Sequence, residues 1–193
     1  MSEQSDPVVA SPRARLLVGA SGSMSVTMLP PYLTALHAEL AETMTVVMTH
    51  SARRFLPAHT VGLLADRVVT GDDPADWPTD NQASLAAGHD IVIVLPATAN
   101  MLAAAATGAA PNLLAGVILA ATCPVVFFPV MSASMWAKPS VARNIEQLRA
   151  DGHHVVDPAW AERYDVASRS VAENPTLPPP PAVVAAVREL LAG

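Results

Sequence analysis

Residues 90–100 read DIVIVLPATAN, and this segment decides the fold. Its first six residues form an almost continuous β-branched run, which predicts a central parallel strand buried on both faces. Residues 101–106, MLAAAA, are good helix formers, so Thr98 and Asn100 are expected beside the N-terminus of a helix. Backbone N–H groups at such an end favour anions, and open α/β sheets bind ligands at the carboxyl ends of their strands. The segment therefore predicts a ligand site as well as a strand.

The chain on either side repeats the alternation of strand and helix. We expect further strands at residues 14–20, 43–49, 124–129 and 154–156, and helices at about 26–40, 53–56, 113–121, 144–151 and 182–192. This alternation predicts an α/β fold: a doubly wound parallel sheet in a three-layer α/β/α arrangement. Residues 59–82 are expected to be loop-like, with a turn at residues 71–74.

Small and hydroxylated residues follow two of the expected strands. Ser21-Gly22-Ser23 comes after the first strand, and Thr49-His50-Ser51 after the second. Parallel strands end at one edge of a sheet, so these residues are expected near Thr98 and Asn100. Such a Gly-Ser turn allows a phosphate to approach the backbone closely, although a plain strand–helix connection is an equal alternative.

Composition excludes several classes of function. The net charge of −6 and only 11 scattered Lys and Arg residues argue against nucleic acid as a partner. The single cysteine, Cys123, excludes a disulfide framework and a Cys-rich zinc site, and His153-His154 has no further metal ligands at a suitable spacing. We expect no signal peptide, no membrane span and no metal, and therefore a cytoplasmic location.

Two segments differ from the rest in composition. Residues 1–13 are typical of a disordered tail, which leaves 14–193 as a single domain. Residues 157–181 are expected to be irregular and end in four prolines at 178–181. Long irregular segments in compact domains are functional or disordered, so residues 159–177 are interpreted as a mobile flap near the site.

Four ordered motifs resemble the homo-oligomeric flavin-containing cysteine decarboxylases, which include the peptidyl-cysteine decarboxylases of lantibiotic biosynthesis. Residues 96–100, PATAN, resemble the family's Pro-Ala-Ser-Ala-Asn-Thr segment, with Met101 at the final threonine. Residues 129–136, PVMSASMW, are similar to Pro-x-Met-Asn-x-x-Met-Trp, whose Met-Trp is typical of the lantibiotic branch. The Ser21-Gly22-Ser23 turn and residues 49–55 match in order and spacing. The resemblance runs from about residue 15 to 187 and implies a Rossmann-like flavoprotein.

The resemblance implies FMN at a subunit interface within a homotrimer or dodecamer. It assigns cofactor contacts to Gly22, Ser23, Thr49, Ser51, Phe55, Thr98, Ala99, Asn100 and Met101, although core packing is an alternative for Phe55 and Met101. It assigns residues 158–178 to a clamp over a peptide substrate. The substrate contacts would then be Asn112, Met131, Met135, Trp136, Arg163 and Arg169.

Two positions depart from the family at its catalytic residues. A histidine fourteen residues before the first motif's proline is Gln82 here, and the asparagine expected to bind the substrate carboxylate is Ser132. Glutamine cannot exchange a proton near neutral pH, so His59 and His89 are the available substitutes. His59 lies in a segment that could reach a neighbouring subunit, whereas a structural role is favoured for His89.

The sequence leaves three functions open. The first is oxidative decarboxylation of a C-terminal cysteine in a ribosomally made precursor peptide, giving an aminoenethiol for aminovinyl-cysteine formation, alone or with other peptide-modifying enzymes. The second is a non-catalytic FMN-binding scaffold subunit, suggested by Gln82 and Ser132. The third is chemistry on a phosphopantothenoyl or prenyl substrate, which suits the long clamp less well.

Overall fold

The computed structural model describes residues 13–165 and 169–193. The predicted tail at 1–13 lies outside this part of the chain except for Arg13, whose guanidinium donates to the Ala41 carbonyl oxygen at 2.8 Å. No helix in the described segments has the length and apolar character needed to cross a membrane.

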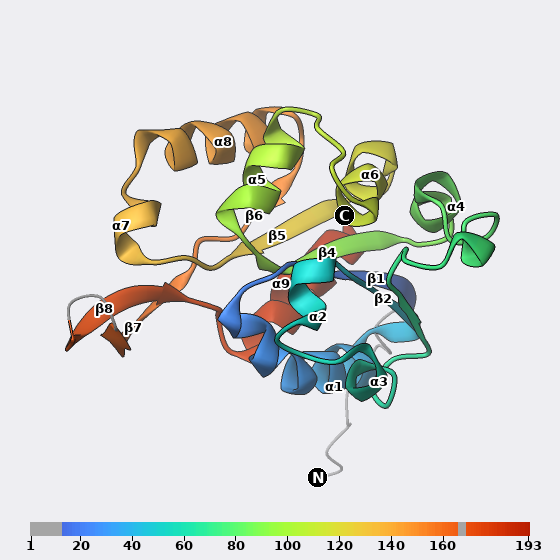
Figure 1. Cartoon of the computed structure of the whole chain (residues 1–193), viewed down its shortest axis with the longest axis horizontal. Coiled ribbons are helices and arrows are strands. Elements are labelled where there is room, and N and C mark those ends of the chain that lie inside the picture. The colour runs from blue at the N-terminus through green and yellow to red at the C-terminus, as the bar shows by residue number, and fades with distance from the viewer. Residues whose placement is uncertain (1–12, 166–168) are drawn as a thin grey trace, which may run out of the picture.

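A six-stranded sheet forms the centre of the molecule (Figure 1). The strand order is β3-β2-β1-β4-β5-β6, and every neighbouring pair is parallel. The order reverses direction between β1 and β4, so this pair forms the topological switch point of the sheet. The doubly wound parallel sheet predicted from the sequence is confirmed. The strands are β1 (Ala14–Ala20), β2 (Ala41–Met48), β3 (Arg67–Val69), β4 (Ile91–Ala97), β5 (Val125–Pro129) and β6 (His154–Val155).

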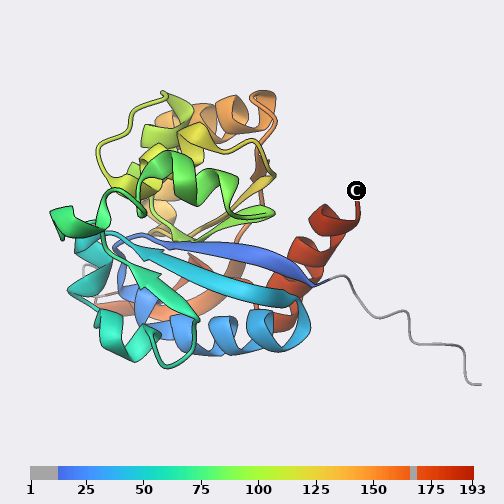
Figure 2. The same cartoon turned by 90° about the vertical axis from the view of Figure 1, so that its right-hand side faces the viewer.

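Helices cover both faces of the sheet, as Figure 2 shows edge-on. Alternate residues of β4 belong to the two cores: Ile91, Ile93 and Leu95 to one, Val92 and Val94 to the other. This alternation is the pleat of a strand buried on both sides. The first core contains side chains from α1 (Leu29–Glu39), α2 (His50–Arg53), α3 (Ala58–Val61) and α9 (Pro180–Ala192). The second contains side chains from α4 (Gln82–Ala87), α5 (Ala99–Ala106), α6 (Leu113–Ala120) and α8 (Pro139–Ala150).

The loop-like segment predicted for residues 59–82 is wrong in part. It contains α3, the edge strand β3, the short 3-10 helix η2 (Pro74–Asp76) and the start of α4. Strand β3 was missed because three residues are too few to show a period. The helix expected from residue 26 begins as a 3-10 helix, η1 (Met24–Met28), and continues as α1 with its prolines in the first turn.

The irregular segment predicted for residues 157–181 is also wrong over most of its length. It forms an antiparallel hairpin of β7 (Ala159–Asp165) and β8 (Ser170–Thr176), a separate two-stranded sheet beside α7 (Ala133–Trp136) (Figure 1). Trp160, Tyr164 and Val171 lie on one face of this hairpin, which is the period-2 pattern that the composition had obscured. Its role as a mobile clamp stays a prediction.

Candidate functional site

A cavity of about 490 Å³ lies at the carboxyl ends of β1, β2, β4 and β5, across the switch point of the sheet. This is where open α/β sheets bind ligands. Its walls come from five places in the sequence: the turn after β1, the start of α2, the start of α5, the start of α6 and the segment after β5. The lining residues are Ser21, Gly22, Ser23, Thr49, Ser51, Thr98, Ala99, Asn100, Met101, Asn112, Val130, Met131 and Met135.

The turn after β1 is tied to the PATAN segment by one buried serine. The Ser21 hydroxyl donates to the Pro96 carbonyl oxygen at 2.7 Å and accepts from the Thr98 N–H at 3.0 Å. These two bonds hold the ends of β1 and β4 at a fixed separation. The order of the strands predicted Ser21 to lie near Thr98, but no role was predicted for it.

The same turn approaches the start of α2 so closely that only glycine fits at residue 22. A Cβ built on Gly22 would lie 2.3 Å from the Ser51 Cβ and 2.8 Å from its carbonyl carbon. Next to it, the Ser23 hydroxyl is buried without a hydrogen-bond partner in the described structure. Buried hydroxyls are normally paired, so this oxygen is available to a ligand. Gly22 and Ser23 together form a cradle suited to a phosphate.

Side-chain caps begin the helices around the cavity. The Thr98 hydroxyl accepts from the Met101 N–H at 3.2 Å at the start of α5. The Asn112 amide oxygen accepts from the Ala115 N–H at 3.0 Å at the start of α6, and the Thr49 hydroxyl caps α2 in the same way. Each cap fixes where a helix begins. The positive ends of the α5 and α6 dipoles are thereby directed towards the cavity rim.

Among the described residues that line the cavity, none has a charged side chain. The nearest arginine in the sequence, Arg53, is occupied: its guanidinium donates to the Asp72 carboxylate at 2.8 Å and also contacts His50. An anion in the cavity would therefore be bound by hydroxyls and backbone N–H groups. Such donors suit a phosphate ester and the polar edge of a flavin.

The structure brings most of the predicted site residues together. Gly22, Ser23, Thr49, Ser51, Thr98, Ala99, Asn100, Met101, Asn112, Met131 and Met135 all line the cavity, and Val130 joins them without having been predicted. Phe55 is half exposed and does not line it, so its flavin contact stays a prediction. Trp136, Arg163 and Arg169 also lie outside the lining.

The residues proposed for proton transfer lie apart from the cavity of their own chain. Gln82 is the first residue of α4 and lines two smaller cavities, one of which it shares with Asn112. His59 is exposed on α3, and Ser132 caps α7 with its side chain outside the lining. In the described structure the side chains of these three residues are exposed, so a second molecule can reach them, and none of them lines the cavity of its own chain.

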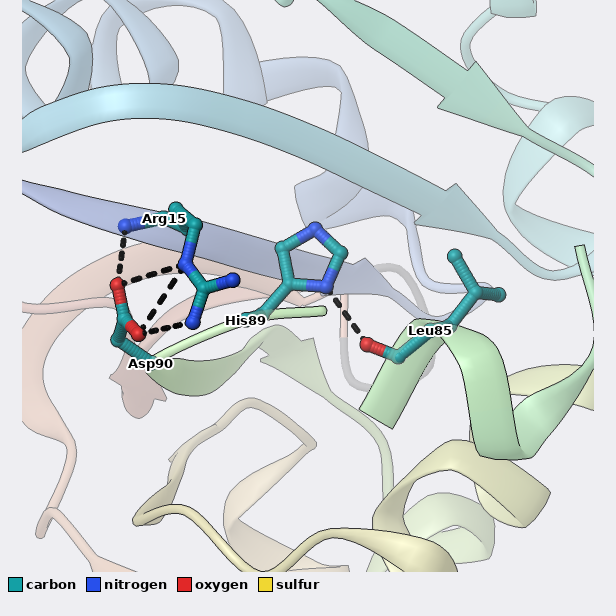
Figure 3. Close-up of polar contacts among 4 residues, drawn as sticks. All are labelled: Arg15, Leu85, His89 and Asp90. Atoms are coloured by element: carbon teal, nitrogen blue, oxygen red, sulfur yellow. Dashed lines mark hydrogen bonds and ion pairs between the residues drawn. The ribbon is translucent and has the colours of Figure 1, made fainter. Parts of the chain in front are cut away.

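His89 lies at the opposite edge of the sheet (Figure 3). Its Nδ1 donates to the Leu85 carbonyl oxygen at 2.6 Å, and burial lowers the pKa of its imidazole. Asp90 and the seven residues of β4 lie between it and Thr98, and the strand alone spans roughly 20 Å at the usual rise per residue. His89 therefore closes the end of α4 and is not a catalytic substitute in this cavity.

Comparison with known proteins places these features in a family. The sequence profile described as Flavoprotein matches residues 5–189. The chain belongs to this family. Mersacidin decarboxylase of Bacillus sp. (strain HIL-Y85/54728) is 35% identical over 175 residues, which cover 91% of this chain and 89% of that protein. The solved structure of MrsD from the same strain is 32% identical with a TM-score of 0.78, covering 95% of this chain and 98% of that one.

Two further similarities extend the comparison. The solved structure of SpaF, described as an FMN-dependent cysteine decarboxylase, is 32% identical with a TM-score of 0.73, covering 92% of this chain and 95% of that one. The coenzyme A biosynthesis bifunctional protein CoaBC of Mycobacterium tuberculosis (strain ATCC 25618 / H37Rv) is 37% identical over 145 residues, but they cover 75% of this chain and only 34% of that protein. The family and the Gly22–Ser23 cradle both support the prediction of a flavin, FMN, as cofactor.

Proposed function

We propose that this protein is an FMN-dependent oxidative decarboxylase acting on the C-terminal cysteine of a ribosomally made precursor peptide. The observation that carries the proposal is the cavity at the β1/β4 switch point, whose lining combines the glycine cradle, a Ser23 hydroxyl that has no partner in the described structure, and the apolar side chains of Met131 and Met135. The similarity to mersacidin decarboxylase over 91% of the chain supports the reaction class.

The lining residues divide into a polar part and an apolar part. Gly22, Ser23, Thr49 and Ser51 would hold the phosphate and the ribityl chain, because they supply hydroxyls and an open backbone. Residues 98–101 would border the isoalloxazine ring. Met131 and Met135 form an apolar wall on which a cysteine side chain can pack, and methionine adapts its shape to sulfur-containing ligands.

The proposed reaction converts a peptidyl cysteine to an aminoenethiol with loss of carbon dioxide and two hydrogens. Bound FMN would supply the two-electron oxidation of the cysteine Cβ–SH group to a thioaldehyde. The C–CO₂⁻ bond then breaks, and its electron pair is delocalised onto sulfur as an enethiolate. The task of the protein is to orient the cysteine, exclude water and hold the peptide carboxylate, for which the Arg163 and Arg169 guanidiniums on the hairpin are candidates.

Proton exchange is the step for which this chain lacks the family's residue. The Gln82 amide can orient a substrate by hydrogen bonding but cannot exchange a proton. We infer that the proton carrier is a group of the bound substrate or a residue of a second copy of the chain. His59 of that second copy is the candidate residue, because its side chain is exposed. A homotrimer or dodecamer would provide that second copy, and Gln82 and Ser132 would then border a partner's cavity.

The test is mass spectrometry of short Cys-terminal peptides incubated with the purified yellow protein. We expect a product that has lost carbon dioxide and two hydrogens. The control is the same peptides ending in serine, which cannot form a thioaldehyde. A flavin-bound protein that leaves every Cys-terminal peptide unchanged, with and without candidate partner enzymes, would reject the proposal.

The second candidate function is a non-catalytic FMN-binding scaffold subunit of a peptide-modifying complex. Gln82 and Ser132 favour it, since both stand where the family has catalytic or substrate-binding residues. The double variant Gln82→His, Ser132→Asn separates the two functions. If the native protein is an inactive scaffold, the double variant should show a decarboxylase activity that the native protein lacks. Turnover by the unaltered protein would exclude this candidate. A phosphopantothenoyl-cysteine conjugate tests the third function that the sequence left open, and turnover of this conjugate in preference to Cys-terminal peptides would favour that function.

A further inference from the structure

The side chain of Asn174 on β8 joins the hairpin β7–β8 to the start of α7. Its amide oxygen accepts from the Ala133 N–H at 2.9 Å, and its amide nitrogen donates to the Ala172 carbonyl oxygen at 3.2 Å. The two partners fix the orientation of the amide, because the flipped amide would oppose donor to donor and acceptor to acceptor. The bond therefore connects two segments 41 residues apart in the sequence.

Helix α7, whose Ala133 N–H donates this bond, makes few other contacts with the rest of the described structure. It has four residues, none of them buried, and only Trp136 among them packs partly against the core. The Ser132 hydroxyl that caps it accepts from the Met135 N–H at 3.4 Å, beyond the usual range for a hydrogen bond to a backbone N–H. A segment with few buried contacts depends on its polar contacts for its position. The Ser132 hydroxyl also contacts the Ser134 hydroxyl at 3.0 Å, but both bonds of Ser132 are local, whereas the Asn174 bond holds the first turn of α7 to a different element.

The first turn of α7 is also part of the cavity wall. Met131 and Met135 line the cavity on either side of Ser132. Ala133, the residue that Asn174 contacts, lies between them in the sequence. A shift of α7 would therefore move the apolar surface on which the substrate cysteine is proposed to pack.

We propose that Asn174 is a positioning residue that fixes α7, and with it Met135, so that the hairpin and the cavity wall form one surface for the cysteine end of the peptide. This inference rests on the proposed function. Asn174 acts through Ala133 and Met135 and takes no part in the chemical step. Its loss should weaken substrate and transition-state binding equally, which raises KM and leaves kcat unchanged.

The neighbouring residue provides a matched control. Glu173 is exposed and pairs with Glu162 across the hairpin, on the face opposite to that of Asn174, because successive residues of a strand point to opposite sides. Glu173→Ala changes the same strand without touching α7. Asn174→Asp keeps an oxygen that can accept from the Ala133 N–H but loses the donor to the Ala172 carbonyl oxygen, whereas Asn174→Ala removes both.

The experiment measures kcat and KM for one Cys-terminal peptide with the flavin-bound forms of Asn174→Ala, Asn174→Asp and Glu173→Ala. We expect Asn174→Ala to raise KM by about threefold to tenfold, the effect of one hydrogen bond. Glu173→Ala should retain KM within about twofold, and Asn174→Asp, which keeps the bond to Ala133 but loses the one to Ala172, should raise KM by less than Asn174→Ala. Flavin content and Tm, measured on each variant, should be unchanged, which separates positioning from folding.

Three results would overturn the inference: an unchanged KM in Asn174→Ala, an equal loss in Asn174→Asp, or a fall in kcat alone. Peptide binding is measured in parallel by titrating the flavin fluorescence of each holoprotein. If the unaltered protein binds peptide but does not decarboxylate it, the proposed function fails, while the weaker binding expected of Asn174→Ala still tests the positioning role. If the unaltered protein binds no peptide, both fail.

Discussion

The two edges of the central sheet carry polar residues of opposite character. At the amino edge, Arg15 bonds the Asp90 carboxylate through both its backbone N–H and its guanidinium, the shortest contact being 2.6 Å, and His89 bonds a carbonyl oxygen (Figure 3). At the carboxyl edge, the lining consists of hydroxyls, amides and small residues, and the Ser23 hydroxyl is buried without a partner in the described structure. The amino edge contains charged groups, but these groups are paired with one another or with the backbone of the same chain.

This difference shows that charge alone is a poor guide to a site. The sequence offered His89 as a catalytic substitute because imidazole can exchange protons. The structure satisfies its Nδ1 within the chain and disfavours its charged form by burial. The carboxyl edge has uncharged groups with unused hydrogen-bonding capacity and space beside them, and these are the properties that a ligand requires.

Among the proposed variants, Gly22→Ala should have the largest effect on flavin binding at the carboxyl edge. The added methyl group would overlap the Ser51 Cβ, so the turn after β1 and the start of α2 must separate. We expect the purified variant to lose its flavin and its yellow colour, as measured by absorbance. Gly62→Ala is the control, because its Cβ would have no atom nearer than 3.5 Å and its φ of −62° suits alanine. A yellow Gly22→Ala protein would contradict the cradle.

Ser23→Ala should have a smaller effect at the same edge. The apoprotein loses a buried hydroxyl that has no partner, so its Tm should not fall. The affinity for FMN should fall by about 10- to 100-fold, the effect of losing a hydrogen bond to a charged group. Titration of the apoprotein with FMN, followed by fluorescence, measures it. Ser25→Ala, in the 3-10 helix η1 that follows the turn and outside the lining, should bind normally, and equal affinities of the two variants would refute the role of Ser23.

Asp90→Asn at the amino edge should have the smallest effect. The pair is partly exposed, so at neutral pH Tm should fall by at most about 4 °C, with flavin binding unchanged. Hydrogen bonds from Arg15 hold the pKa of the Asp90 carboxyl below its usual value. A lowered pKa in the folded state gives stability that is present above the unfolded value and is lost as pH falls through the folded one.

The pH dependence of Tm checks that assignment. In acid, below the ordinary titration range of aspartate, the unaltered protein should lose stability more steeply than Asp90→Asn. Glu146→Gln, an exposed change on α8, should retain the steep dependence. Parallel curves for the unaltered protein and Asp90→Asn would show that the Arg15–Asp90 pair contributes nothing to the pH response.

The sequence predicted most of the fold because the central strands are long and apolar. Strand β1 has the bounds expected from its residues, and β4 and β5 differ from theirs by at most two residues at either end. The edge strand β3 and the antiparallel strands of the hairpin were harder to predict, whereas the other edge strand, β6, was expected at residues 154–156. Strand β3 has only three residues, and Pro175 and Asn174 interrupt the apolar pattern of β8. Their pairing depends on partners that are distant in the sequence.

The candidate site was predictable where it follows strand ends and less so where it depends on three-dimensional packing. Hydroxyls after parallel strands must meet at one edge, so Thr49, Thr98 and Ser23 could be assigned from order alone. The contact between Asn174 and Ala133 could not, because it joins the hairpin to a helix across 41 residues. The separation of Gln82 and His59 from the cavity likewise depends on how α3 and α4 pack on opposite faces of the sheet.

The uncharged lining has a consequence for regulation. A pocket whose donors are hydroxyls and backbone amides keeps the same electrostatic character across the whole physiological pH range. We therefore expect the pH dependence of the activity to come from titrating groups outside the lining. These groups are the flavin, the substrate thiol and carboxylate, or a residue of a neighbouring molecule. The charge of the cavity lining would stay constant, and the pH profile of the activity would change with the peptide substrate.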